Sequence, residues 1–207
     1  MNWKIKEISF ENALDTDNNP GIRTTIDNPS APWTMAYSQE QEHSIKRSNL
    51  IATIPKMTKK WRVSFEVKPR DYNSPFASVL HLTIGNKGGR IGDRTPAIWF
   101  HKERGIIVST AMPMDGVPSF IKAFKSAPPL GKWTKLVISQ DLERNFYFFS
   151  FNVGNKTVFN KTNREPVELD YVKVYSGSPW WSAQAGSIRN LKIEISAPAS
   201  YELKGRA

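Results

Sequence analysis

The stretch that decides the fold is Trp61-Arg62-Val63-Ser64-Phe65-Glu66-Val67-Lys68-Pro69. Its apolar residues occupy every second position, and polar residues fill the positions between them. Because successive side chains of a β-strand point to opposite faces, this alternation predicts a strand with one buried face and one wet face. Pro69 is expected to end it, since proline cannot donate a hydrogen bond to a neighbouring strand.

Several other short segments carry strand patterns. They cover residues 78–84, 96–101, 105–109, 133–140, 146–153, 153–159, 171–175 and 188–195. Segments 133–140 and 146–153 are expected to pair as a hairpin, and the second, apolar on both faces, is expected to be covered on both sides. Fourteen prolines and twelve glycines punctuate the chain, and no segment shows a long helical period. This pattern predicts an all-β fold, a two-sheet antiparallel β-sandwich of the jelly-roll type.

The length of 207 residues suits one domain. We expect a single β-sandwich domain over residues 1–196, in which residues 1–45 form a less regular edge strand and long loop. Residues 197–207 are expected to be a C-terminal tail. The N-terminus has no apolar run of signal-peptide length, and no segment is long and apolar enough for a membrane span.

The amino-acid composition limits the kinds of functional site and partner that the chain can have. The chain has no cysteine, which excludes disulfides, thiolate metal sites and a cysteine nucleophile. Its formal net charge of +10 suits polyanionic partners such as acidic polysaccharides; alternatively, the basic residues, which are spread along the chain, only form solvated faces. The chain contains no recognised nucleic-acid-binding module, so nucleic acid is not expected as a partner.

The core of the chain resembles a known fold family. The matching residues are Trp61 to Pro69, Ser78 to Thr83, Gly92 to His101, Trp133 to Lys135, Val172 to Tyr175, Ser178 to Trp180 and Ile188 to Leu191. They resemble concanavalin A-like lectin/glucanase (laminin-G-like) domains, most closely those of cnidarian and molluscan extracellular and skeletal-matrix proteins. The resemblance implies an extracellular jelly roll that binds a glycan or matrix polymer. We expect a non-catalytic binding domain, because the catalytic motifs of enzymes with this fold are not found in the sequence.

Strand parity places a group of aromatic residues on one outer sheet face. If Ile98 and Phe100 fill the core, then Trp99 and His101 point outwards, and the same argument sends His81 outwards. Aromatic rings stack on the apolar faces of sugars, so Trp99 is the expected platform of a ligand site. The alternative is that a loop covers this face and that the rings form a second small core.

Loop residues are expected to form the rim of this site. Asp93 and Arg94 follow a glycine-rich loop and could read sugar hydroxyls or anions; alternatively, they pair with each other or with Arg189. The loop that contains Trp180, Trp181 and Gln184 carries two adjacent tryptophans, of which one is expected to be exposed. Trp180, Gln184 and Arg189 complete the predicted rim.

Metal binding and catalysis have weaker support. Asp15, Asp17 and Asn19 have the alternate spacing of a calcium loop, but Ile26 stands where a bidentate glutamate is needed. They are either a plain loop or a weak calcium site, and no other cofactor is indicated. The paired carboxylates of a glycosidase are not evident, although His81 with an outer-face tyrosine could imitate a polysaccharide lyase. A polysaccharide-active enzyme and a polyanion-binding scaffold therefore remain the alternatives.

Overall fold

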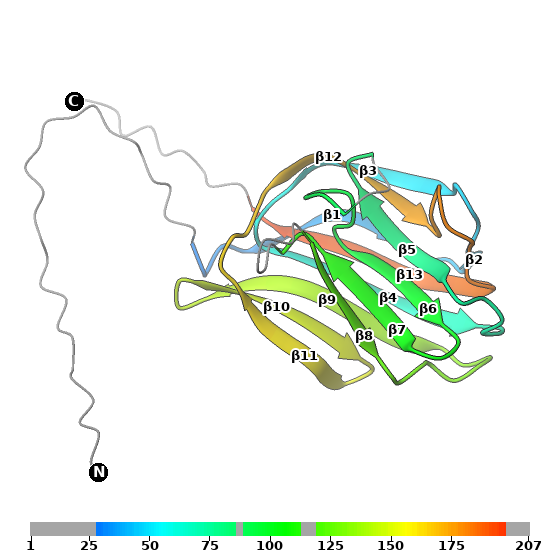
Figure 1. Cartoon of the computed structure of the whole chain (residues 1–207). Helices are drawn as coiled ribbons and strands as arrows, with labels where there is room; N and C mark the ends of the chain where they lie inside the picture. The colour runs from blue at the N-terminus through cyan, green and yellow to red at the C-terminus, as the bar shows by residue number, and fades with distance from the viewer. Residues whose placement is uncertain (1–27, 86–88, 113–118, 198–207) are drawn as a thin grey trace, which may run out of the picture.

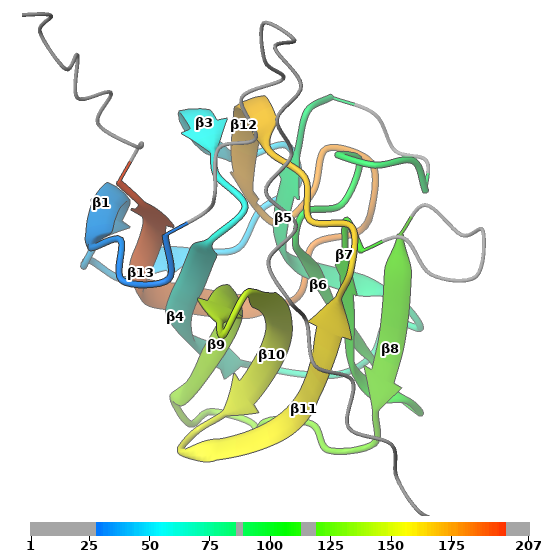
Figure 2. The same cartoon turned by 90° about the vertical axis from the view of Figure 1, so that its left-hand side faces the viewer.

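The structure is a sandwich of two antiparallel sheets. The computed structural model describes residues 28–85, 89–112 and 119–197, and within these ranges it contains thirteen strands and no helix. Figures 1 and 2 show the two sheets packed face to face. This confirms the predicted all-β, two-sheet architecture.

The first sheet, sheet A, has the strand order β1-β13-β4-β9-β10-β11, and β2 also pairs with β13. Its strands are β1 (Trp33–Gln39), β2 (His43–Ser44), β4 (Trp61–Pro69), β9 (Thr134–Glu143), β10 (Phe146–Val153), β11 (Lys156–Asn163) and β13 (Gly186–Ser196).

The second sheet, sheet B, has the strand order β3-β12-β5-β6-β7-β8. Its strands are β3 (Leu50–Met57), β5 (Ala77–Thr83), β6 (Ala97–His101), β7 (Gly105–Thr110), β8 (Phe120–Phe124) and β12 (Leu169–Ser176). Strand β8 lies at an edge of this sheet, and three of its five residues are exposed.

The core lies between the sheets and is filled by alternate residues of the strands. In β4 the apolar residues are buried and the polar residues between them are partly exposed, as the alternation predicts. Phe65 of β4 and Phe149 of β10 are fully buried in sheet A, and Phe100 of β6 meets them from sheet B. Large apolar side chains from both layers therefore share one core.

Two details differ from expectation. Strand β10 has only one buried face: Tyr147 and Phe149 are buried, whereas Phe146 is 59% exposed. The outer face of sheet A at β10 is thus uncovered, and its apolar residues there do not signal a second layer. Ile84 lies just beyond β5 and is also exposed, because the chain turns at Gly85.

Sheet B, by contrast, is buried on both faces at its centre. Every residue of β5, β6 and β7 is buried. One face of these strands packs on sheet A, so the other face must be covered by something else. The segment that leads into β6 and the loop between β12 and β13 supply that cover, as the contacts below show.

Candidate functional site

The register of sheet B sets the outer face of its central strands. Trp99 of β6 lies opposite Ser78 of β5 on one side and Ile107 of β7 on the other. Ile107 in turn lies opposite Ala123 of β8. This row runs across four strands on the face turned away from sheet A, because Ile98 and Phe100 belong to the core between the sheets. The predicted parity of β6 is therefore confirmed.

The predicted exposure of Trp99 is wrong. Only 4% of this residue is exposed, and it forms a second small cluster with Ala97 and Ile107. The alternative of a covered outer face describes this part of the molecule better. The cause is the loop that follows β12, which lies over the sheet and brings its tryptophans against the outer face.

Two backbone hydrogen bonds of Ser78 attach that loop to β5. The amide of Ser78 donates to the carbonyl of Ser182 at 2.7 Å, and the amide of Gln184 donates to the carbonyl of Ser78 at 2.9 Å. These two hydrogen bonds make an isolated parallel bridge between Ser78 and Ala183. The loop thus runs beside the start of β5 like a short extra strand.

His81 lies beneath this cover and is fully buried. Its Nε2 lies 2.9 Å from the carbonyl oxygen of Asp93, to which it donates. Its ring meets Trp99 edge-on at 5.7 Å and Trp180 at 5.5 Å between centroids. Burial lowers the pKa of His81 to about 4, so the ring is neutral near neutral pH. Its contacts are those of a packing residue.

Asp93 and Gln184 are also buried and hold loops in place. The Oδ2 atom of Asp93 accepts a hydrogen bond from the amide of Arg90 at 2.9 Å. The side-chain amide of Gln184 donates to the carbonyls of Asp71 and Ala185. With 1% exposure each, neither side chain is open to a ligand, so the predicted rim roles of these two residues are replaced by structural ones.

His101 shapes the turn between β6 and β7. Its Nδ1 accepts hydrogen bonds from the amides of Glu103 and Arg104, at 3.1 and 3.2 Å. Its ring is covered by Phe76, with the centroids 5.0 Å apart. His101 is 8% exposed. It fixes this turn but does not line the pocket described next.

A pocket of about 350 Å³ lies beside Trp99 on this outer face. Trp99, Ile107 and Ala123 form the row that crosses the strands at its floor. The lining residues are Phe76, Arg94, Trp99, Arg104, Ile107, Ile121, Ala123 and Trp181. Three aromatic rings, two guanidinium groups and a few aliphatic side chains therefore meet in one concave surface.

Two of the predicted site residues line this pocket, Trp99 and Arg94. The guanidinium of Arg94 lies over the indole of Trp99, 5.6 Å from its ring centroid. Trp180 does not line it, because its ring is packed on His81. The neighbouring Trp181, 36% exposed, takes the place expected for Trp180. One tryptophan of the pair is thus partly buried against His81, and the other is exposed.

Besides Trp181, sequence reasoning missed five of the lining residues. Ile121 and Ala123 lie on β8, which was not predicted because its five residues alternate around a lysine and carry no clear turn signals. Arg104 lies in a turn and Phe76 just before β5, and nothing local links these positions to Trp99. Ile107 falls in the predicted strand over residues 105–109, and its position opposite Trp99 follows only from the pairing of β6 with β7.

Arg189 belongs to the other sheet. It is part of β13 in sheet A, where its Nε donates to Glu66 at 2.7 Å and its guanidinium lies 4.3 Å from the ring centroid of Trp133. The predicted rim role of Arg189, and its pairing with Asp93 or Arg94, are therefore wrong. Pairing with Glu66 is fixed by the register of β13 on β4, which places these two residues opposite each other.

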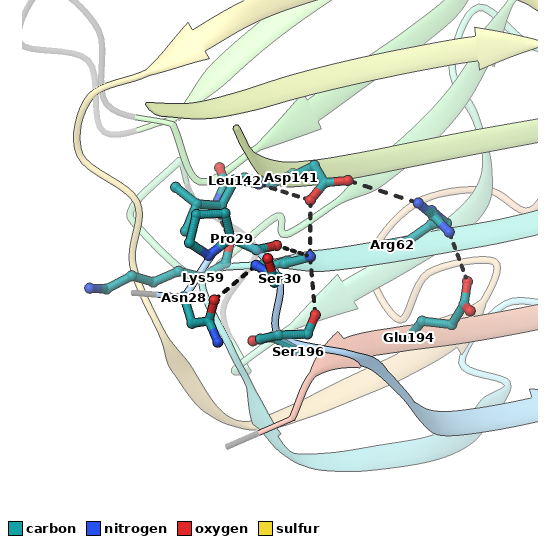
Figure 3. A network of polar contacts seen from close by, with 12 residues as sticks. Asn28, Pro29, Ser30, Lys59, Arg62, Asp141, Leu142, Glu194 and Ser196 are labelled. Atoms are coloured by element: carbon teal, nitrogen blue, oxygen red, sulfur yellow. Dashed lines mark hydrogen bonds and ion pairs between the residues drawn. The ribbon is translucent and has the colours of Figure 1, made fainter. Parts of the chain in front are cut away.

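Other basic residues on the outer face of sheet A also have acidic neighbours. Figure 3 shows Arg62 between Asp141 and Glu194, with separations of 4.0 and 3.7 Å. Lys60 contacts Asp141 at 3.4 Å, and Lys68 contacts Glu42 at 3.2 Å. Carboxylates on the same face neutralise these cations. This face therefore attracts an anionic ligand less strongly than the formal net charge suggests.

No metal centre is evident in the described part of the chain. It contains no group of three or more histidine, cysteine or acidic residues arranged to hold a metal ion. The calcium candidate formed by Asp15, Asp17 and Asn19 lies outside the described residues. Within those residues no helix is long and apolar enough to cross a membrane.

Comparisons with known proteins support the fold. No protein-family model and no curated protein sequence matches the chain. Among solved structures, the CBM40 domain of Ruminococcus gnavus IT-sialidase bound to alpha2,3 sialyllactose is similar, with a TM-score of 0.57 and 12% identity over 77% of this chain and 91% of that domain. The heptameric SAP-like pentraxin of Limulus polyphemus has a TM-score of 0.50 and 8% identity over 75% of this chain and 76% of its own. These are β-sandwich proteins of the jelly-roll type, in agreement with a concanavalin A-like fold.

Proposed function

We propose that the chain is a non-catalytic glycan-binding domain whose ligand occupies the pocket beside Trp99. The observation that carries this proposal is the pocket itself. It combines partly exposed aromatic rings with two arginines beside the buried central strands of sheet B. Its volume of about 350 Å³ falls within the range of small-ligand sites.

The lining suits a sugar ring. Phe76 and Trp181 are 41% and 36% exposed, so their rings can contact the apolar C–H face of a pyranose. Ile121, 53% exposed on the edge strand β8, extends the apolar surface. The guanidinium groups of Arg94 and Arg104 provide only hydrogen-bond donors, which suit hydroxyl, carboxylate or sulfate oxygens.

The same lining favours binding over catalysis. Among the described residues that line the pocket, none is an aspartate, glutamate or histidine. Glycoside hydrolysis needs two carboxyl groups on either side of the scissile bond, and a lyase needs an acid and a base at the sugar. His81 and Asp93 lie nearby, but both are buried and hydrogen-bonded within the protein. His81 donates to the backbone carbonyl of Asp93, and the Asp93 side chain accepts from the amide of Arg90.

The proposed setting is extracellular, as the resemblance implies. Two glycosylation sequons begin at Asn155 and Asn160, and both asparagines are exposed, one in the turn before β11 and one on β11. An exposed asparagine in a sequon is open to modification in a secreted protein. Expression through a secretory pathway, followed by enzymatic removal of N-glycans, should reveal a shift in mass at these positions. Absence of glycan at both would count against secretion.

A glycan array is the direct test of the proposed function. The domain should bind a restricted set of glycans, and Trp181→Ala should lose that binding because it removes the exposed aromatic wall of the pocket. Phe146→Ala is a matched control, since Phe146 is also an exposed aromatic residue but lies on β10 of the opposite sheet. Equal loss in both variants, or no glycan binding by the unmodified domain, would overturn the proposal.

A further inference from the structure

We propose that the pocket recognises its sugar through a methyl substituent, which lies on the aliphatic part of the floor formed by Ile107 and Ala123. The ligand class is a pyranose that carries an acetamido group or a 6-deoxy carbon, since each of these presents a methyl group beside a polar ring. This inference rests on the proposed function, and it adds the feature of the sugar that the pocket selects.

The floor of the pocket is apolar. It is the row in which Trp99 of β6 lies opposite Ile107 of β7, and Ile107 lies opposite Ala123 of β8. A hydroxyl group placed on these aliphatic side chains would lose its hydrogen bonds to water, which costs free energy. A methyl group in the same place gains free energy, because apolar surface leaves water.

Side-chain size makes a recess at Ala123. Its single methyl group lies between two larger side chains that also line the pocket, Ile107 on the neighbouring strand and Ile121 two residues earlier on β8. The Cβ atoms of paired residues in antiparallel strands are about 5 Å apart. Residues two apart along a strand are separated by about 6.6 Å. Carbon atoms attract best at about 4 Å, so a methyl group above Ala123 can touch both isoleucines.

The recess is open to a ligand, and its far wall is fixed. Strand β8 is an edge strand, and its residues Ile121 and Ala123 are both exposed. Ile107, in contrast, is 4% exposed and packs on Trp99 and Ala97. A ligand can therefore approach over β8 and meet a rigid aliphatic surface at β7.

The close approach of β7 and β8 is maintained by a glycine. Gly105 begins β7 with a φ of +76°, and a side chain at this position would collide with the carbonyl oxygen of Phe124 on β8. The two strands are thus paired tightly at the end of the floor where Arg104 stands. The recess keeps its shape because its two walls belong to paired strands.

The polar ring of the sugar also finds partners in the lining. Phe76 and Trp181 are exposed, and aromatic rings contact the C–H face of a pyranose. Arg104 lies in a turn whose backbone is held by His101, and its exposed guanidinium lines the pocket and can donate. An acetamido group places a carbonyl oxygen beside its methyl group, so it suits this donor and the recess together.

Isothermal titration with two matched pairs of sugars tests the inference. The first pair is N,N′-diacetylchitobiose and cellobiose, which differ in acetamido against hydroxyl groups. The second pair is L-fucose and L-galactose, which differ in a methyl against a hydroxymethyl group. In one pair or both, the methyl-bearing sugar should bind about tenfold or more tightly, as for one carbon group added in an apolar pocket. The pair that shows the difference identifies the acetamido or the 6-deoxy source.

Saturation-transfer NMR shows which part of the bound sugar touches the protein. With the preferred sugar, the methyl protons should receive a larger fraction of the saturation than the ring protons, because they lie among the side chains of the floor. Stronger saturation of the ring protons than of the methyl protons would contradict the proposed orientation.

Variants of β8 locate the methyl group. Ala123→Leu should fill the recess and weaken binding of the preferred sugar by about tenfold or more, and Ile121→Ala should weaken it by removing one wall. Ala127→Leu is the matched control, since Ala127 is also an exposed alanine but lies in the loop after β8 and does not line the pocket. Melting curves of the three variants report whether each one folds.

The outcomes separate this inference from the proposed function. Equal affinity within both pairs, or glycan-array binding confined to sugars without acetamido or 6-deoxy groups, would overturn selection by a methyl group and leave a glycan-binding pocket. Unchanged binding by a folded Ala123→Leu variant would overturn the placement on the floor. Failure of every glycan on the array would remove the proposed function itself.

Discussion

Trp99 and Trp181 both line the pocket but differ in what they contribute. Trp99 is 4% exposed and packs on Ala97 and Ile107, whereas Trp181 is 36% exposed at the rim. Trp99→Ala should therefore reduce the free energy of unfolding by about 3–5 kcal/mol, as large-to-small changes of buried aromatic residues do. Trp181→Ala should change it by less than about 0.5 kcal/mol. Chemical denaturation of the two variants measures both values, and a stable Trp99→Ala protein would mean that this ring is not part of a core.

His81 makes stability depend on pH. Burial lowers its pKa in the folded protein to about 4, from an ordinary value of 6.5. Between these values the unfolded chain binds a proton at this ring and the folded protein does not, so the stabilising contribution is complete above pH 6.5 and is lost as the pH falls towards 4. The loss should amount to about 3 kcal/mol.

The matched variant for this effect is His81→Gln. Its side-chain amide can donate to the carbonyl of Asp93 but does not titrate. Denaturation at pH 7, 5.5 and 4 should show a shallower decline in the variant than in the unmodified protein. If the two proteins lose stability in parallel, the decline comes from carboxylates and His81 has no part in it.

At the scale of the strand, alternation predicted which side chains face the core. In β4 the buried positions are Trp61, Val63, Phe65 and Val67, as the pattern requires. The same alternation correctly predicted that the side chains of Trp99 and Phe100 point to opposite faces of β6. Alternation could not tell whether the outward face is wet, because that depends on a loop some 80 residues further along the chain which docks on Ser78.

The pairing of strands that are distant in sequence also could not be predicted from local sequence patterns. Arg189 was predicted to lie at the rim of the site, yet its strand β13 pairs with β4 in sheet A. Arg104 and Ile121 were overlooked because they come together only when β7 pairs with both β6 and β8. Sheet order is a property of the whole fold, and sequence periodicity carries little information about it.

A pair of substitutions in β4 tests the strand assignment. Phe65 is 1% exposed in the core, and Ser64 points to the opposite face. Phe65→Ala should cost about 3–5 kcal/mol of unfolding free energy, and Ser64→Ala less than about 0.5 kcal/mol. Similar costs for both substitutions, measured by urea denaturation, would show that the parity of this strand is reversed.

At the scale of the whole molecule, net charge and pocket charge predict different responses to salt. The formal net charge of the whole chain is +10, whereas the described lining of the pocket includes two cations, Arg94 and Arg104. If an acidic glycan binds through those two, the slope of log affinity against log salt concentration should lie between about −1 and −2. A polyanion that adheres to the basic surface in general would release more counterions and give a steeper slope. Titrations at several salt concentrations distinguish the pocket from a scaffold-like polyanion binder.

The most direct test of the central claim is to locate a bound glycan by the indole N–H signals of the seven tryptophans. In a two-dimensional nitrogen–proton NMR titration with the best-binding oligosaccharide, the signals of Trp99 and Trp181 should shift together, because both line the pocket on sheet B. The signals of Trp33 and Trp133, which lie against cations of sheet A, should stay in place. Shifts confined to Trp33 or Trp133, with Trp99 and Trp181 unmoved, would contradict the claim that the glycan binds beside Trp99.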